Sequence, residues 1–457
     1  MIGCMPSFAR PLILRQPAEL TLDCAPRLAV VTCWQFLIFC ALFSVMFLPE
    51  FIREGPASDS YWLYRKAVGG FRMVDLGIVA LIIVHAAAVV SSRQISVSFP
   101  RPLFLPGVAF AACIATAISY GVMQGGTNFF FDWRGLALGT ALYLVWAVWM
   151  QTPSAIAAGI RIFAACVAIR LALLYLQYMR GPRETLLGVP IPTFDGPSIS
   201  ALVFAALLAL WAQETTADRL QKLFWMALAA ACYVMVLLCF RRTYWIQLAI
   251  GTVVLMVLQR RRWLRNTLAF GTAIALAAVL MGQPLLSRMQ AVNPLQEDNE
   301  FGADNSDHLH DLEDAWEQIK QSPILGIGVG TAYPTWESKS WKSESVMVHN
   351  ALIHVWLKYG ICGLVSYIWF HVALLWQLGR GCRRPVRGAS FRPAIFAYCT
   401  AQFVTTMAFA PWPYAELQMT TLLSFVLAAA FMSPAGNISR REVFCETSNS
   451  VCRYAGA

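Results

Sequence analysis

The chain has 457 residues, of which 58% are hydrophobic and 13% charged, and apolar runs of about 18 or more residues recur along it. This composition excludes a soluble domain and predicts an all-α polytopic membrane protein, because barrel strands would alternate apolar with polar residues. The net charge of +10 indicates positively charged cytoplasmic loops and contact with membrane lipids, and we expect no nucleic-acid binding.

The apolar runs predict about twelve transmembrane helices, nine within 28–282 and three within 349–433. A cytoplasmic N-terminal segment at 1–27 and a cytoplasmic tail at 434–457 flank them. The individual spans are expected at 28–48, 73–91, 102–120, 135–151, 154–178, 197–213, 223–240, 243–258, 265–282, 354–378, 394–410 and 418–433. The fourth and fifth spans, and the seventh and eighth, are predicted to be tight hairpins.

A polar segment at 283–348 separates the ninth and tenth predicted spans and contains many of the acidic residues. The arginine-rich connections 259–265 and 379–393 are expected on the cytoplasmic side, since short loops rich in Lys and Arg stay inside. The polar segment then becomes one large outer, periplasmic loop, and we interpret it as the roof of an active site. Arg161 and Arg170 fall inside the fifth span, where a charge usually faces a cavity or a partner.

Within the polar segment, HLHDLEDAWEQIKQS is typical of a short amphipathic helix lying along the outer membrane surface. Leu309, Leu312, Trp316 and Ile319 recur at helical spacing and predict one apolar face. Asp307 is expected to cap the start of this helix and Pro323 to end it. The following helix is expected to begin near His349 and Asn350 and to run into the tenth span.

Three glycines of the run GIGVG (Gly326, Gly328 and Gly330) follow the amphipathic helix. The run lacks the GxGxxG spacing and the P-loop lysine of nucleotide-binding loops, and it follows a helix rather than a strand. It is instead typical of close backbone approach, either to a neighbouring helix or to a phosphate bound by backbone N–H groups. A purely structural turn is an equally good interpretation.

Basic and histidine side chains at the outer face are candidates for chemistry. His349 stands at a helix N-terminus, which favours a neutral imidazole able to act as a general base, although the residue could also serve as the helix cap. Arg241 and Arg242 begin the eighth span, and paired guanidinium groups suit a pyrophosphate. They could equally contact lipid headgroups, and Arg288 has the same two interpretations.

The segments PILGIGVGTAYP and VHNALIHVWLKYGICGL resemble the signature region of the O-antigen ligase/polymerase superfamily, over roughly 305–365. Its pattern is a helix with a tryptophan, a Pro-Gly run, a loop and a His-Asn pair followed by two glycines. The matching residues are Trp316, Pro323, Gly326, Gly328, Gly330, His349, Asn350, Leu352, Gly360 and Gly363. FRRTYW resembles the arginine with which the family begins a span.

The resemblance implies an inverting, metal-independent glycosyltransferase of the bacterial inner membrane that uses no cofactor. Its donor would be an undecaprenyl-pyrophosphate-linked glycan, and its acceptor hydroxyl would belong to lipid A-core, a second lipid-linked repeat or a protein Ser/Thr. His349 would activate the acceptor or assist the leaving group, and Arg241 or Arg242 with Arg288 would hold the pyrophosphate. Asn350 and the three GIGVG glycines would support the site or contact substrate, and a chain-length regulator is a partner to test for.

One position departs from the family pattern. Members often carry an arginine where this chain has His308, fifteen residues before Pro323, and His310 follows two residues later. The second phosphate contact could come from Arg288, or His308 or His310 could replace the arginine in binding substrate, or the donor could be held differently. This difference and the extended acidic segment lead us to favour a repeat-unit polymerase of O-antigen or exopolysaccharide slightly over a ligase or a protein O-oligosaccharyltransferase. The alternative from another class is a polysaccharide transporter or flippase, for which the expected repeat symmetry and broken helices are not seen in the sequence.

Overall fold

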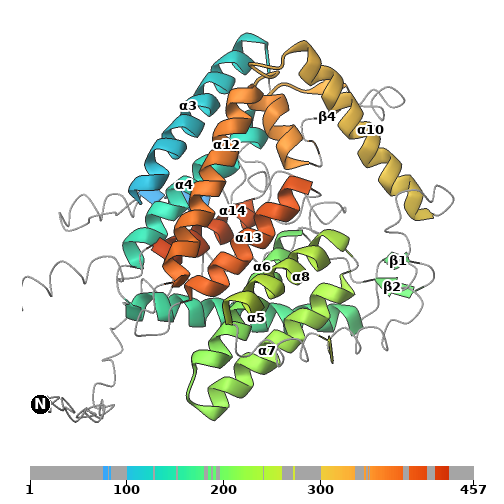
Figure 1. Ribbon diagram of the computed structural model, residues 1–457. Helices are drawn as coiled ribbons and strands as arrows, with labels where there is room; N and C mark the ends of the chain where they lie inside the picture. Colours follow the sequence, from blue (N-terminus) through green and yellow to red (C-terminus); the bar gives the residue numbers. More distant parts are fainter. Residues whose placement is uncertain are drawn as a thin grey trace, which may run out of the picture.

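In the computed structural model, helices account for most of the described part of the chain (Figure 1). The described residues are 76–80, 82–83, 100–126, 129–150, 153–179, 184–186, 189–191, 196–239, 241–259, 271–272, 300–334, 344–345, 348, 350–383, 391–408 and 417–431. The predicted all-α class is confirmed for these residues. Their only paired strands are two short antiparallel ladders, β1 (Glu184–Leu186) with β2 (Val189–Ile191) and β3 (Tyr333–Pro334) with β4 (Glu344–Ser345).

Predicted spans coincide with helices wherever the structure describes them in full. In chain order the helices are α3 (Arg101–Met123), α4 (Phe129–Trp149), α5 (Pro153–Met179), α6 (Gly196–Thr215), α7 (Arg219–Leu238), α8 (Arg242–Gln259), α12 (Ala351–Arg383), α13 (Arg392–Ala408) and α14 (Leu417–Phe431). Five of the described helices are long and apolar enough to cross a membrane, namely α3, α5, α6, α7 and α12. The spans at 28–48, 73–91 and 265–282 lie wholly or mostly outside the described residues, so the number twelve stays a prediction.

The two predicted hairpins are divided where the sequence suggested. Helix α4 ends at Trp149 and α5 begins at Pro153, while α7 ends at Leu238 and α8 begins at Arg242. The indole N–H of Trp245 donates to the Val236 carbonyl oxygen at 3.0 Å and thereby ties the start of α8 to the end of α7. Within α5, Arg170 is buried as expected of a charge at membrane depth, whereas Arg161 is exposed.

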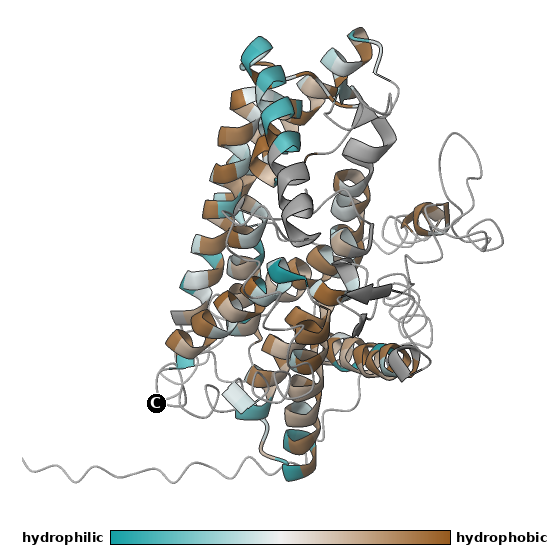
Figure 2. Cartoon of the chain, turned by 90° about the vertical axis from the view of Figure 1, so that its right-hand side faces the viewer, coloured by the Kyte–Doolittle hydropathy of each residue, from teal (hydrophilic) through white to brown (hydrophobic). Residues whose placement is uncertain are grey.

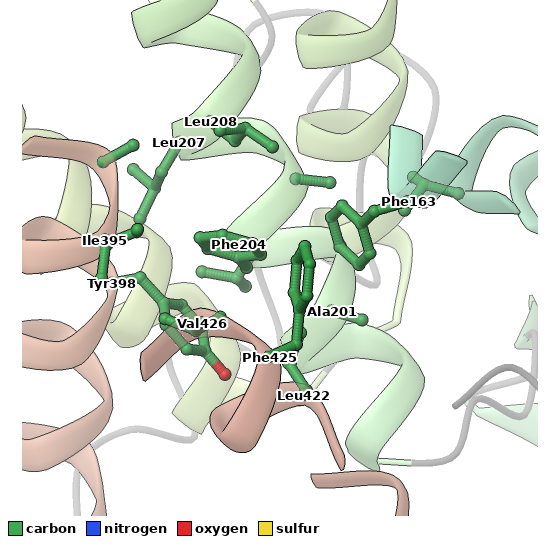
Figure 3. Packing of buried hydrophobic residues seen from close by; sticks show 14 of the residues in the cluster. Phe163, Ala201, Phe204, Leu207, Leu208, Ile395, Tyr398, Leu422, Phe425 and Val426 are labelled. Carbon is green, nitrogen blue, oxygen red and sulfur yellow. The ribbon is translucent and has the colours of Figure 1, made fainter. Parts of the chain in front are cut away.

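The main hydrophobic core lies among α4 to α8, α13 and α14, and aromatic rings tilted against one another form its centre (Figure 3). Phe163 contacts Phe204 and Phe425, with ring centroids 5.4 and 5.6 Å apart, and Phe204 contacts Tyr398 at 5.1 Å. Such rings bury large apolar areas in preferred tilted geometries. The rings therefore fix α5, α6, α13 and α14 against one another.

The contacts of α6 show which of its neighbouring helices run parallel to it and which run antiparallel. Later positions on α6 meet earlier positions on α13, because Ser200 bonds Gln402 and Phe204 packs on Tyr398 (Figure 3). Against α8 the order is parallel: Ser200 lies at Gln247, and Leu207 lies at Gly251. Helices α8 and α13, which also pack together, are therefore antiparallel.

A second group consists of α3, α12 and α10 (Glu300–Gln321), which meet at one end of the molecule (Figure 1). Cys113 of α3 lies at Ser366 of α12 and Gly107 at Phe370, so α3 and α12 are antiparallel and the end of α3 lies beside the start of α12. The hydrophilic colour along the described part of α10 contrasts with the apolar helices in Figure 2.

Helix α10 is longer than the sequence predicted. It begins at Glu300, so the expectation that Asp307 caps its start is wrong, and Asp307 lies inside the helix. The end at Gln321, two residues before Pro323, agrees with the prediction. The predicted apolar face is present but incomplete: Ile319 is buried, whereas Trp316 is 41% exposed. The apolar periodicity begins only at Leu309, and it does not extend to the charged first turns of the helix.

Candidate functional site

The glycine-rich loop at 323–331 connects α10 to the rest of the polar segment and lies against both α12 and α3. Gly326, Gly328 and Gly330 have φ of 71°, 87° and 80°, a region in which glycine is favoured. A side chain on Gly326 would meet the Leu357 carbonyl oxygen of α12 at 2.5 Å. One on Gly328 would meet the backbone of Gly121 in α3 at 2.6 Å. The loop thus makes the close backbone approach that its composition suggested.

Backbone N–H groups of this loop bond to protein carbonyl groups. Ile327 donates to the Leu357 oxygen at 2.7 Å, Val329 donates to the Ala117 oxygen at 3.0 Å, and Gly326 donates to the Ser322 oxygen at 2.9 Å. These three N–H groups therefore hold the loop against α12, α3 and the end of α10. Among the alternatives for GIGVG, the described geometry supports helix contact rather than phosphate binding through these groups.

Helix α12 is interrupted at Gly360, which the sequence analysis did not anticipate. This residue has φ 69° and ψ −176°, so the first segment, 351–359, is separated from the long remainder. The loop occupies the break: the Ile361 N–H donates to the Pro323 oxygen at 3.0 Å, and the Ile324 carbonyl fills the space where a Gly360 side chain would stand. The second glycine of the motif, Gly363, packs closely on Tyr359 and faces Cys113 of α3.

Trp316, the tryptophan of the motif, lies on α10 and packs against the first segment of α12. Its ring lies edge-on to that of Trp356 on α12, with centroids 5.3 Å apart. The Trp356 indole N–H in turn donates to the Pro323 oxygen at 3.0 Å. Tryptophan, proline and glycine positions of the motif thus belong to one structural unit that attaches α10 and the loop to the first segment of α12.

The start of α12 is capped by Asn350. Its side-chain oxygen accepts from the N–H groups of Leu352 at 3.0 Å and Ile353 at 3.1 Å, which is the arrangement of a helix N-cap. Its side-chain nitrogen donates to the Met407 oxygen at 3.2 Å and attaches this start to the end of α13. The capping role suggested as an alternative for His349 is therefore filled by Asn350. His349 itself precedes Asn350 and lies outside the described residues.

Arg241 and Arg242 stand at the start of α8, where the Arg241 carbonyl accepts from the Tyr244 N–H at 3.1 Å. Arg241 is exposed and Arg242 half-buried. Gln247 lies five residues after Arg242 and bonds Gln402, which lies five residues before Met407 on the antiparallel α13. Each residue of an α-helix advances the same distance along the helix axis. The first turn of α8 therefore lies at the same height along the bundle as Met407 of α13, to which Asn350 is bonded.

A buried polar cluster under the loop was missed by the sequence analysis. The ammonium group of Lys358 donates to the Thr331 oxygen, and the Tyr333 hydroxyl donates to an Asp311 carboxylate oxygen at 2.6 Å. His354 is buried one turn before Lys358 on the same helix. A signal was present in the sequence, because His354 and Lys358 are four residues apart in an otherwise apolar run and must share a helix face.

The remaining candidates are described only in part. His310 lies on α10 with its Nδ1 3.4 Å from a Glu313 carboxylate oxygen on the same helix. The backbone of His308 belongs to α10, while its side chain and the whole of Arg288 lie outside what the structure describes. Asn350 and the arginine pair are thus brought to one end of the bundle. The contribution of His308, His310 and Arg288 to a site there stays a prediction.

Comparison with known proteins agrees with the motif. The family model described as O-antigen ligase matches residues 223–368, which extend from α7 through the first part of α12 and include the arginine pair, the loop and the His-Asn motif. A curated O-antigen ligase of Salmonella typhimurium is 31% identical over 84 residues, which are 16% of this chain and 20% of that protein. The match therefore spans about a fifth of the relative's length. These matches support the resemblance to the O-antigen ligase/polymerase superfamily over residues 223–368, about a third of the chain.

Proposed function

We propose that the protein is a membrane glycosyltransferase that moves a glycan from an undecaprenyl-pyrophosphate donor to an acceptor hydroxyl on the periplasmic face. The main support for this proposal is that the starts of α8 and α12 lie at the same height along the helix bundle. Arg241 and Arg242 begin α8, and Asn350, the neighbour of His349, joins the start of α12 to Met407 at that level. Transfer from a pyrophosphate donor is assisted by cations that bind the leaving group and by a base that activates the acceptor, and the proposal assigns both to this end of the bundle.

In the proposed reaction His349 accepts the proton of the acceptor hydroxyl. The acceptor oxygen then attacks the anomeric carbon opposite the leaving group and forms the new glycosidic bond. The bond between that carbon and the pyrophosphate oxygen breaks, undecaprenyl pyrophosphate departs with the electron pair, and the anomeric configuration inverts. Positioning a general base in this way contributes about 10²–10⁴-fold to a rate.

The leaving group would be held by Arg241, Arg242 and Arg288. Guanidinium groups bond phosphate oxygens in pairs and remain charged, so in this proposal they neutralise the pyrophosphate without a metal ion. The start of α8 adds the partial positive charge of a helix N-terminus, which is stabilising for an anion. Both contributions act where the negative charge grows as the glycosidic bond breaks.

For the acceptor, we favour a second lipid-linked repeat, as in a repeat-unit polymerase. Two differences from a ligase support this choice: the extended acidic segment, of which α10 presents Glu313 and Glu317 to solvent, and His308 at a position where the family often has an arginine. A ligase activity is the second candidate, because the relative matched at 31% identity is an O-antigen ligase.

The deciding experiment uses the purified full-length protein in proteoliposomes with a lipid-linked oligosaccharide donor. Three acceptors are supplied separately: a second lipid-linked repeat, lipid A-core and a Ser/Thr peptide. We expect lengthened lipid-linked chains in the first reaction, whereas product on lipid A-core alone would identify a ligase. Movement of the donor across the membrane with no transfer to any acceptor would contradict the proposal and favour a flippase.

A further inference from the structure

A buried polar network joins α6, α8 and α13 one to two turns below the arginine pair. Ser200, Gln247, Tyr398 and Gln402 are all buried. The Gln247 amide N–H donates to the Gln402 side-chain oxygen, and the Ser200 hydroxyl donates to the same oxygen at 3.2 Å. The hydroxyl oxygens of Ser200 and Tyr398 lie 2.8 Å apart. The surrounding core is apolar and aromatic (Figure 3).

The network resists sliding of α8 along α13. Amide groups among apolar neighbours have no water to replace a lost partner, so separating Gln247 from Gln402 leaves both groups buried and unsatisfied. Apolar contacts alone are less selective, since leucine and alanine side chains can repack after a shift. The polar bonds are therefore the contacts that best specify one register between these two helices.

We propose that Gln247 and Gln402 are positioning residues that set the level of Arg241 and Arg242 relative to the start of α12. The connection runs from the arginine pair along α8 to Gln247, across to Gln402, along α13 to Met407 and through Asn350 to the start of α12. The inference rests on the proposed function, because it assumes that the arginine pair binds the donor and that His349 reacts with the acceptor. Neither glutamine contacts substrate in this proposal.

The kinetic test compares Gln402→Leu with Gln402→Glu in the proteoliposome assay. Leucine removes the shared acceptor oxygen, whereas glutamate keeps it. For Gln402→Leu we expect kcat to fall on the order of tenfold with the donor KM little changed, because the arginines still bind while attack is misaligned. Gln402→Glu should recover most of the loss. A loss of binding alone would instead raise KM at constant kcat.

A matched control is available on the same helix. Thr252 of α8 is equally buried, and its hydroxyl lies 2.5 Å from that of Tyr233 on α7. Thr252→Val removes a buried hydrogen bond between α8 and α7 and leaves the Gln247–Gln402 bond in place. If Gln402→Leu and Thr252→Val lower kcat equally, the glutamines have only a general packing role and the inference is wrong.

A distance measurement reports the register between α8 and α13 independently of enzyme activity. Nitroxide labels at the exposed positions Val257 on α8 and Val404 on α13 report sliding by pulsed EPR, in a background without the label-reactive cysteines. We expect the distance distribution to shift or broaden in Gln402→Leu, by up to the ~5.4 Å of one helical turn, but not in Thr252→Val. An unchanged distribution would overturn the inference. Absence of transfer by the unsubstituted protein would instead contradict the proposed function, and the EPR result would still decide the register.

Discussion

At the scale of single residues, Asn350 fills the capping role that was one interpretation of His349, and the other interpretation, a general base, stays the proposal to test. Asn350 caps α12 and bonds Met407, so the helix start does not require the imidazole. We therefore expect His349→Ala to lower transfer by about 10²–10⁴-fold without changing the protein level or membrane insertion. The measurement is product formation from the lipid-linked donor, with the protein level measured by immunoblot.

The control is Gln221→Ala, because Gln221 is exposed near the start of α7, at the opposite end of that helix from the arginine pair. This variant should keep most of the activity. Normal product from the His349→Ala protein would show that the imidazole is not the base.

The arginine pair leads to a second prediction at this scale. Lysine at position 242 keeps the charge but loses the paired bonds of the guanidinium group, so we expect Arg242→Lys to weaken donor binding on the order of tenfold. Arg219→Lys is the control, since Arg219 is an exposed first-turn arginine at the far end of α7. Full activity of Arg242→Lys would assign the pyrophosphate to Arg241 or Arg288.

At the scale of elements, the break in α12 depends on Gly360. Its φ of 69° is unfavourable for other residues, and the Ile324 carbonyl occupies the place of a side chain. We expect Gly360→Ala to destabilise the protein by about 1–3 kcal/mol and to lower the Tm in a detergent-solubilised unfolding assay. Gly107→Ala in α3 is the control, because its nearest neighbour is the Phe370 ring at 3.8 Å. Equal Tm values for the two variants would refute this account of the break.

Helix boundaries show what local patterns can predict. Pro323 and the apolar face placed the end of α10 correctly, because proline and packing positions act locally. The start of α10 was predicted too late, since exposed charged residues form helix without any apolar repeat to reveal it. The break at Gly360 was missed for a different reason. A glycine in a helical run has the same sequence signature whether or not another segment is inserted against it.

At the scale of the whole molecule, the periplasmic position of the polar segment is the prediction to test. Glu313 is exposed on α10, and Gln221 is exposed near the start of α7, on the predicted cytoplasmic side. We expect Glu313→Cys to react in intact cells with a maleimide that cannot cross the inner membrane, and Gln221→Cys to react only after permeabilisation. The unsubstituted chain measures the background from its own cysteines. The reverse labelling pattern would invert the topology.

The sequence alone was enough to predict an all-α membrane protein, the positions of most described helices and a motif that resembles the signature of the superfamily. These features depend on apolar length, charge and short spacings, which are local properties of the chain. Only the tertiary structure shows that Asn350 bonds Met407 and that Gln247 bonds Gln402. It also shows that Lys358 bonds Thr331 and that Tyr333 bonds Asp311. Those pairings depend on which helices pack together and in which register. That choice minimises unsatisfied buried polar groups across the whole bundle, and no single stretch of sequence contains it.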